Sequence, residues 1–388
     1  MSTPLTIALD AMGSDHAPAP EVAGAVAAVK EYGIRLLLVG QEERLQKALA
    51  AYPAAARANI EIVPASEVIT MEDTAVRAVR TKRDSSVHGC ARLVKSGRAV
   101  GLVSAGNTGA IMATSKLMLG TLEGVQRPAL ATVVPTAGGR AAILIDVGAN
   151  VDCRPDHLEQ FAVMGATYFD VILGCDRQDA VAGPRVGLLS IGEEESKGNE
   201  LTHEAFALLR QLPLNFVGNV EGRDIYRGNV DVIVCDGFVG NVALKISEGL
   251  VETVRSTLQE ELARTWASRL GYLLSRGAFL TLKKRLDYTE YGGAPLLGVR
   301  GVVIICHGRS NAKAIKSAIR VAAESAQRAI NQQIESQIQK LRPPDAPAVT
   351  TPQPTLTGAG PRSAAPSDPL APGGAGTLGP VPPGAVQS

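Results

Sequence analysis

Short apolar runs of strand length alternate with longer segments of helical periodicity along most of this 388-residue chain. The runs cover residues 6–11, 34–40, 60–65, 99–105, 130–135, 141–147, 186–191, 215–220, 230–235 and 302–306. Most are almost entirely apolar, as strands covered on both faces must be. The segments between them predict helices over residues 20–31, 86–95, 107–119, 155–173, 200–212, 239–263 and 311–339. This rhythm predicts parallel βα units, and therefore a three-layer α/β/α sandwich with a mostly parallel sheet.

Two segments depart from the rhythm. Residues 248–286 have helical periodicity without an intervening strand, and their apolar middle at 270–280 is interrupted by glycine, which predicts a protruding helical hairpin. After Leu341, 12 of the 47 residues are proline and 7 are glycine, with four charges and no aromatic side chain. Such a segment cannot bury enough apolar surface to offset its ordering entropy. We therefore expect a folded catalytic body over residues 1–341 and a disordered tail over 342–388.

Charge and cysteine usage exclude several classes of protein. The formal net charge is +1, and one Trp and six Phe leave little for base stacking, which disfavours nucleic-acid binding. The five cysteines are far apart, without a CxxC pair or a Cys/His cluster of metal-ligand spacing, so neither a disulfide framework nor a structural zinc site is indicated. No leader peptide is apparent, and no apolar stretch approaches the ~20 residues of a spanning helix. The sequence predicts a soluble cytoplasmic protein and leaves attachment to a membrane surface open.

Seven of the apolar runs end in clusters rich in Gly, Asn, Ser and acidic residues. These clusters cover residues 10–15, 104–109, 146–150, 192–199, 218–223, 236–241 and 307–311. Ligands of open parallel sheets bind beyond the carboxyl ends of the strands, although Gly and Asn also serve as ordinary turn residues. Seven clusters exceed what turns require, and we expect them to line a shared crevice along one edge of the sheet.

Residues 104–109 lead directly into a predicted helix, where backbone N–H groups and the helix dipole favour an anion such as phosphate. An N-capped helix without a ligand is the alternative. Lys197, beside Gly198 and Asn199, suits a phosphate oxygen, but it is also explained as a solvated charge near three glutamates. No GxGxxG follows the first predicted strand, where residues 10–15 lie instead, and no GxxxxGK[ST] or GxSxG motif is present, so no nucleotide cofactor is expected. Cys235 and Cys306 lie within apolar runs, where buried thiols are expected.

The clusters together resemble the bacterial phosphate acyltransferases of phospholipid synthesis, over about residues 6–329. The motifs are DAMG (10–13), SAGNTGA (104–110), DVGAN (146–150), KGNE (197–200), GNVEGRD (218–224), DGFVGN (236–241) and YGGAPLLG (291–298). One departure is Ser14, where the family usually has a second glycine.

The resemblance implies reversible transfer of a fatty acyl group from acyl-(acyl carrier protein) to inorganic phosphate. The acyl phosphate product then serves glycerol-3-phosphate acylation by a membrane-bound glycerol-phosphate acyltransferase. The resemblance also implies a fold like the isocitrate and isopropylmalate dehydrogenases and phosphate acetyltransferase, a homodimer, and no nucleotide cofactor. We expect no metal among the site residues. A short-chain acyl-CoA phosphotransacylase, or a non-catalytic scaffold for acyl carrier protein and membrane, remains the alternative.

Phosphate is already nucleophilic and a thioester has a good leaving group, so the protein must mainly position the reactants and stabilise the oxyanion. As catalytic residues we expect Lys197 for phosphate, Asn241 for the thioester or a phosphate oxygen, Asp236 to orient these donors, and His307 to protonate the leaving thiolate. A structural His and carboxylates that cap helices or turns are the alternatives. The expected substrate and phosphate site comprises Asp10, Gly13, Ser104, Gly106, Asn107, Thr108, Gly109, Asp146, Asn150, Gly198 and Asn199.

Two surfaces are candidates for docking. Arg77, Arg80, Lys82 and Arg83 form a local basic patch for an acidic carrier protein, or simply a solvated helix face. The apolar tip of the predicted hairpin fits peripheral membrane contact and fits a dimer contact equally well. The tip residues are Tyr272, Leu273, Leu274, Phe279 and Leu280.

Overall fold

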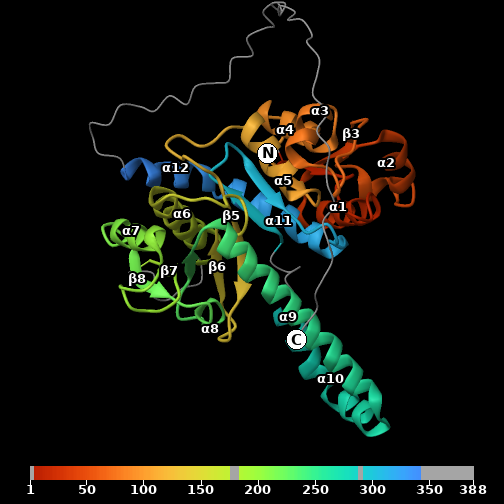
Figure 1. Ribbon diagram of the computed structural model, residues 1–388. Helices are drawn as coiled ribbons and strands as arrows, with labels where there is room; N and C mark the ends of the chain where they lie inside the picture. Colours follow the sequence, from red (N-terminus) through yellow and green to blue (C-terminus); the bar gives the residue numbers. More distant parts are fainter. Residues whose placement is uncertain (1–3, 175–182, 287–291, 342–388) are drawn as a thin grey trace, which may run out of the picture. The chain divides into compact units, whose positions relative to one another are not determined.

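The computed structural model describes residues 4–174, 183–286 and 292–341, with the backbone alone at 280 and 282–286. Within these ranges, eleven strands form one mixed sheet with helices on both faces (Figure 1). The strands are β1 (Thr6–Asp10), β2 (Arg35–Gly40), β3 (Ile60–Pro64), β4 (Gly101–Ser104), β5 (Ala129–Pro135), β6 (Ala141–Ile145), β7 (Arg185–Leu189), β8 (Asn215–Val220), β9 (Val232–Val234), β10 (Ala294–Leu297) and β11 (Val302–Ile305). The tail expected at 342–388 and Cys175 lie outside the described residues.

Twelve α-helices are present in the described ranges. They are α1 (Ala19–Tyr32), α2 (Glu42–Leu49), α3 (Ala75–Thr81), α4 (Ser86–Lys95), α5 (Thr108–Met118), α6 (Pro155–Tyr168), α7 (Glu200–Leu209), α8 (Asp224–Arg227), α9 (Gly237–Arg264), α10 (Trp266–Leu286), α11 (Ala312–Gln327) and α12 (Ile330–Lys340). A π-helical turn, Phe169–Leu173, extends α6.

Two apolar cores lie on the two faces of the sheet. Alternate residues of a strand point to opposite faces, so Ile7 and Leu9 of β1 join one core while Ala8 between them joins the other. The first core contains side chains of α1, α6, α11 and α12, and the second those of α3, α4 and α5. Both faces are therefore covered, which confirms the predicted α/β fold with three layers.

The strand order is β3-β2-β1-β4-β11-β10-β5-β6-β9-β7-β8. One parallel block consists of the neighbouring strands β3, β2, β1, β4 and β11, and the other consists of β6, β9, β7 and β8. Strands β10 and β5 lie between the two blocks. Strand β10 is antiparallel to both β11 and β5, and β5 is antiparallel to β6. The two parallel blocks therefore run in opposite directions, and the sheet is mixed rather than made of parallel βα units alone.

The register shows where the two blocks end. Ile305, the last residue of β11, is opposite Ala294 of β10, and Ile145, the last residue of β6, is opposite Ala131 of β5. Since Leu296 of β10 is opposite Leu130 of β5, the two strand ends differ by about one residue in level, roughly 3 Å along the sheet. The carboxyl ends of both blocks thus meet the central strands along nearly the same line.

The sequence prediction located ten strands and missed β10. That strand is four residues long, contains Pro295 and follows two glycines, so it resembles a loop in sequence. The short helices α2, α3 and α8 were also missed. One helix predicted over 311–339 is two, because the backbone of Ala329 is left-handed (φ 51°) and breaks it between α11 and α12. No Gly or Pro marks this break.

The predicted hairpin is formed by α9 and α10, which lie side by side (Figure 1). Helix α9 begins in the core at Gly237 and becomes mostly exposed beyond Leu244. The chain reverses at Thr265, so Tyr272, Leu273, Leu274 and Phe279 lie within α10 and not at the turn, where the sequence placed them. The side chain of Leu280 lies outside the described residues. In the described chain, no helix combines the length and apolarity needed to cross a membrane.

Substitution by alanine should have opposite effects on stability at two glycines of α9. A Cβ on Gly240 would lie 1.9 Å from the backbone oxygen of Asp146, whereas a Cβ on Gly249 meets nothing within 4 Å. We expect Gly240→Ala to lower the free energy of unfolding by at least about 1–3 kcal/mol, because backbone must move. Gly249→Ala should raise it by about 0.5–1 kcal/mol through helix propensity. Urea unfolding midpoints measure both, and equal midpoints for the two variants would contradict the packing of α9 on the Asp146 loop.

Candidate functional site

Asp10, the last residue of β1, holds the ends of two neighbouring strands together. Its carboxylate accepts hydrogen bonds from Ser104 Oγ of β4 (2.6 Å) and from the N–H of Met12 (3.1 Å), and Ser104 Oγ accepts from the N–H of Gly106 (3.2 Å). Ser104 is fully buried and Asp10 is almost fully buried. Burial raises the pKa of Asp10, and the Ser104 hydroxyl opposes this shift.

The loop after β1 passes directly over the loop after β4. A Cβ on Gly13 would lie 2.7 Å from Gly106 N, so the two backbones can approach this closely only with glycine at position 13. The N–H of Asp15 donates to the carbonyl of Gly308, which follows β11 (2.9 Å). The ends of β1, β4 and β11 are therefore joined in one cluster.

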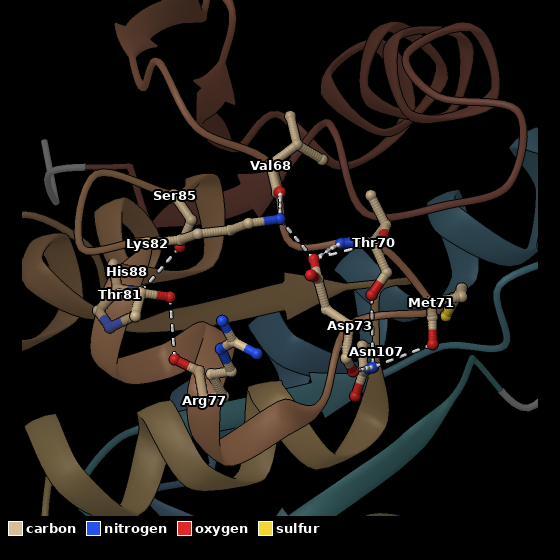
Figure 2. A network of polar contacts seen from close by, with 10 residues as sticks. All are labelled: Val68, Thr70, Met71, Asp73, Arg77, Thr81, Lys82, Ser85, His88 and Asn107. Atoms are coloured by element: carbon tan, nitrogen blue, oxygen red, sulfur yellow. Dashed lines mark hydrogen bonds and ion pairs between the residues drawn. The ribbon is translucent and has the colours of Figure 1, made fainter.

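Asn107 caps α5 and fixes a loop above it. Its Oδ1 accepts from the N–H of Ala110 (3.1 Å), while its Nδ2 donates to the carbonyls of Thr70, Met71 and Asp73 (Figure 2). The side chain is thus fully used by the protein. In the described chain, no hydrogen bond satisfies the N–H groups of Thr108 and Gly109 in the first turn of α5, which leaves two backbone donors for an anion.

The loop above α5 is held by an ion pair. Lys82 Nζ lies 2.5 Å from Asp73 Oδ2 and donates to the carbonyl of Val68 (2.9 Å), and Asp73 also accepts from the N–H of Thr70 (2.8 Å) (Figure 2). The ammonium of Lys82 lowers the pKa of Asp73. Lys82, which the sequence placed in a basic patch or on a solvated helix face, is therefore engaged in an ion pair. Arg77 and Arg80 are exposed on α3.

Asp146 organises the loop after β6. Its two carboxylate oxygens accept hydrogen bonds from the N–H groups of Leu130, Gly148, Ala149 and Asn150 and from Asn150 Nδ2, at 2.7–3.1 Å. Burial raises the pKa of Asp146, and the donors of Ala149 and Asn150 oppose this shift. Asn150 Nδ2 also donates to the carbonyl of Pro128 (2.8 Å). Both side chains thus hold the backbone in place.

The start of α9 packs against this loop. Asp236 Oδ1 accepts from the N–H groups of Phe238 and Val239 (both 2.9 Å), so it caps the helix. Gly237 and Gly240 are buried against residues of the Asp146 loop. Asn241 is exposed one turn into α9, and its side chain lies beside Gly148. The expected residues Asp146, Asn150, Asp236 and Asn241 therefore come together.

Lys197 lies in the loop between β7 and α7. The loop is closed by hydrogen bonds from Lys197 N to the Glu194 carbonyl (3.0 Å) and from Ser190 Oγ to the Lys197 carbonyl (3.2 Å). Asn199 caps α7 through the N–H of Thr202 (2.9 Å), and Gly198 has a left-handed backbone (φ 125°). These two neighbours shape the loop, while the Lys197 side chain is exposed.

His307 lies at the end of β11 and is exposed. Its Nδ1 accepts from the N–H of Arg309 (3.1 Å), which is the hydrogen bond of a turn. The thiols that the sequence placed in strands are buried: burial raises the pKa of Cys235 well above its usual range and that of Cys306 to about 12. A pocket between α6 and α12, lined in part by Val163, Gln333 and Gln337, contains none of the expected site residues.

The expected residues form two groups. Those after β1, β4 and β11 leave one parallel block, and those after β6, β7, β8 and β9 leave the other in the opposite direction. The expectation that all seven clusters share one edge of a parallel sheet is therefore wrong. The reversal of strand direction was not predicted, because it depends on β10 and β5. Strand β10 resembles a loop in sequence, and the sequence of β5 does not show that it pairs antiparallel. Sequence reasoning also missed the loop of residues 68–73 over α5, which carries no motif.

Sequence comparison identifies close relatives. A profile of the family described as "Fatty acid synthesis protein" matches residues 5–333. The phosphate acyltransferase of Koribacter versatilis is 62% identical over 335 residues, which are 86% of this chain and 93% of that protein. The phosphate acyltransferase of Acidobacterium capsulatum is 58% identical over 330 residues, 85% of this chain and 96% of that protein.

Solved structures share the fold at low sequence identity. A phosphotransacetylase from Streptococcus pyogenes aligns with a TM-score of 0.55 at 18% identity, covering 84% of this chain and 95% of that one. The EutD phosphotransacetylase from Staphylococcus aureus aligns with a TM-score of 0.52 at 17% identity, covering 83% of this chain and 94% of that one. These likenesses show the fold of the chain.

Proposed function

Because this chain belongs to the fatty acid synthesis protein family and is a phosphate acyltransferase, we propose that it acylates inorganic phosphate from acyl-(acyl carrier protein). A phosphate oxygen forms the new bond to the acyl carbon, the carbon–sulfur bond breaks, and the sulfur leaves as the carrier thiolate and takes up a proton. The products are acyl phosphate and free carrier protein. The match to relatives named phosphate acyltransferase over most of the chain carries this proposal.

The described residues suit a reaction without a covalent enzyme intermediate. Phosphate is a nucleophile at neutral pH, and the deeply buried thiols of Cys235 and Cys306 have raised pKa values, which disfavours attack by either sulfur. The remaining work is to bring phosphate against the thioester carbonyl and to stabilise the oxyanion. Backbone N–H groups, an exposed amine and an exposed carboxamide are suitable for that work.

We place phosphate at the first turn of α5, where the N–H groups of Thr108 and Gly109 have no partner in the described chain. Lys197 and Asn241 follow β7 and β9 of the other block, and their exposed side chains are the donors assigned to phosphate and the thioester oxygen. Asp10, Asp146 and Asn150 are positioning residues, because their polar atoms hold the loops that bear these donors. His307 and Asp236 stay candidates for proton transfer and orientation.

Phosphate-dependent thiol release tests the reaction and its alternatives. The full chain is mixed with acyl-(acyl carrier protein) or with a short-chain acyl-CoA, with and without inorganic phosphate, and free thiol is followed with a chromogenic reagent. We expect rapid release only from the carrier protein and only with phosphate. Preference for the short-chain acyl-CoA would make the protein a phosphotransacylase of that class, and no release from either would favour a scaffold.

Removal of the exposed donors should slow the reaction. Lys197→Ala and Asn241→Ala should each raise the activation free energy by about 2–4 kcal/mol, because each donor stabilises charge that develops in the transition state. The measurement is kcat/KM in the same assay, with circular dichroism to confirm folding. Lys245→Ala, which removes an exposed amine paired with Glu248 on α9, is the matched control and should leave kcat/KM unchanged. A folded Lys197 variant with full turnover would remove Lys197 from the mechanism.

The carrier protein and the membrane require docking surfaces. For the acidic carrier we propose Arg77 and Arg80 of α3, whose helix packs against α5. The hairpin exposes an apolar stripe at every fourth residue of α9, which we assign to a second copy of the chain. Its residues are Phe238, Val242, Ile246, Leu250, Val254 and Leu258. We assign α10, with Leu274 81% exposed, to peripheral contact of a cytoplasmic enzyme with the membrane that holds the next acyltransferase.

Charge on the two helices of the hairpin should separate dimer from membrane. Leu274→Glu should release the protein from anionic vesicles in a flotation assay and keep its mass in analytical ultracentrifugation. Ile246→Glu, at a residue 65% exposed on α9, should instead weaken the dimer. Leu117→Glu, at a residue 61% exposed on α5, is the control and should change neither. A monomeric Leu274→Glu protein would show that α10 forms the dimer contact instead.

A further inference from the structure

The side chains of Glu21 and Ser14 are polar and buried, and they have no hydrogen-bond partner among the described residues. Glu21 lies in the first turn of α1 with its side chain fully buried, and neither carboxylate oxygen has a partner in the described chain. The Ser14 hydroxyl, in the loop that leads to α1, is also buried and unpartnered. It lies close enough to lower the pKa of Glu21, although no hydrogen bond of ordinary length joins them. Buried polar groups rarely lack partners, so a specific role is indicated.

The pair lies beneath the loops that lead to the proposed phosphate site. Ser14 is between Gly13, which contacts Gly106, and Asp15, which donates to the carbonyl of Gly308. Gly106 leads directly into the first turn of α5. A change at Ser14 or Glu21 is therefore transmitted through one backbone contact to the N–H groups assigned to phosphate.

The surroundings of Glu21 disfavour its charged form. Burial raises the pKa of Glu21 to about 7, the carboxylate of Asp10 adds to the shift, and the Ser14 hydroxyl opposes it. The Cys306 thiol at the end of β11 has a pKa of about 12 and stays uncharged. Three cations of the neighbouring helices are engaged elsewhere. Arg44 of α2 donates to the carbonyl of Ala17, Lys316 of α11 pairs with Glu31 at the far end of α1, and Arg320 of α11 pairs with Glu324.

We propose that Glu21 and Ser14 form a positioning pair for the phosphate site, in which phosphate binds when Glu21 is uncharged and Ser14 sets the pH at which that form is lost. An ionised Glu21 would add a second negative charge beside Asp10, behind a loop that must receive an anion. Repulsion between this carboxylate and a bound anion should weaken phosphate binding by about tenfold. The inference rests on the proposed function, because it needs phosphate at the first turn of α5.

The test compares the KM for phosphate across pH in the full chain and in Glu21→Gln, which keeps the shape of the uncharged acid. Phosphate itself titrates near neutrality, so the ratio of the two KM values at each pH removes that contribution. We expect equal KM values at about pH 6 and a wild-type KM about tenfold higher at about pH 8.5, with kcat unchanged. Ser14→Ala should shift the rise in KM to higher pH, because it removes the nearby hydroxyl that lowers the pKa of Glu21.

Stability gives a second readout that does not need activity. The raised pKa of Glu21 means that the unfolded chain loses this proton first, so wild-type stability falls relative to Glu21→Gln from about pH 4.5 to about pH 7 and is level above that range. Glu31→Gln, on the exposed end of the same helix, is the control for both readouts. If phosphate supports no thiol release at any pH, the proposed function fails. If phosphate-dependent release is present but the KM ratio is constant with pH, the positioning pair alone is overturned.

Discussion

The reversal of strand direction at β10 and β5 is the constraint on which the rest of the structure depends. Without it, every βα loop would leave one edge of the sheet. With it, two parallel blocks point in opposite directions while their carboxyl ends reach the central strands at nearly the same level. In the proposed site, one block supplies the N–H groups at the start of α5, which have no partner among the described residues, and the other supplies Lys197 and Asn241. A two-substrate acyl transfer fits this division, since an anion and a thioester need different donors.

Buried carboxylates hold the loops of each block. Asp10 joins β1 to β4 through Ser104, and Asp146 gathers four backbone N–H groups after β6. Each is a prominent carboxylate of its sequence motif, and each is engaged in hydrogen bonds within the protein. In the proposed mechanism they fix backbone donors in advance, so that little reorganisation is needed when charge develops. The residues that remain exposed, Lys197 and Asn241, carry no special local geometry of their own.

The sequence predicted much of the fold because apolar periodicity is local. Ten strands and most long helices follow from it, and the motifs identified the family before any geometry was known. The strand reversal could not be predicted, since direction depends on which strands pair. The roles of Asn107 and Lys82 were also hidden: a carboxamide at a helix start and a lysine in a basic run look available in sequence, and only the loop at residues 68–73 shows that both are occupied. Likewise, the helix break at Ala329 has a left-handed backbone that no Gly or Pro in the sequence marks.

The loop held by Asn107 and Lys82 gives the enzyme one continuous polar path from the α3 surface to the first turn of α5. With phosphate at that turn, as proposed, a screen for lost phosphate use should return alleles in the α3 to α4 segment as well as alleles in the glycine-rich loops. Second-site suppressors of such alleles should map to the same path, because restoring the loop restores the helix start. Separation along the sequence is thus a poor guide to which residues act together.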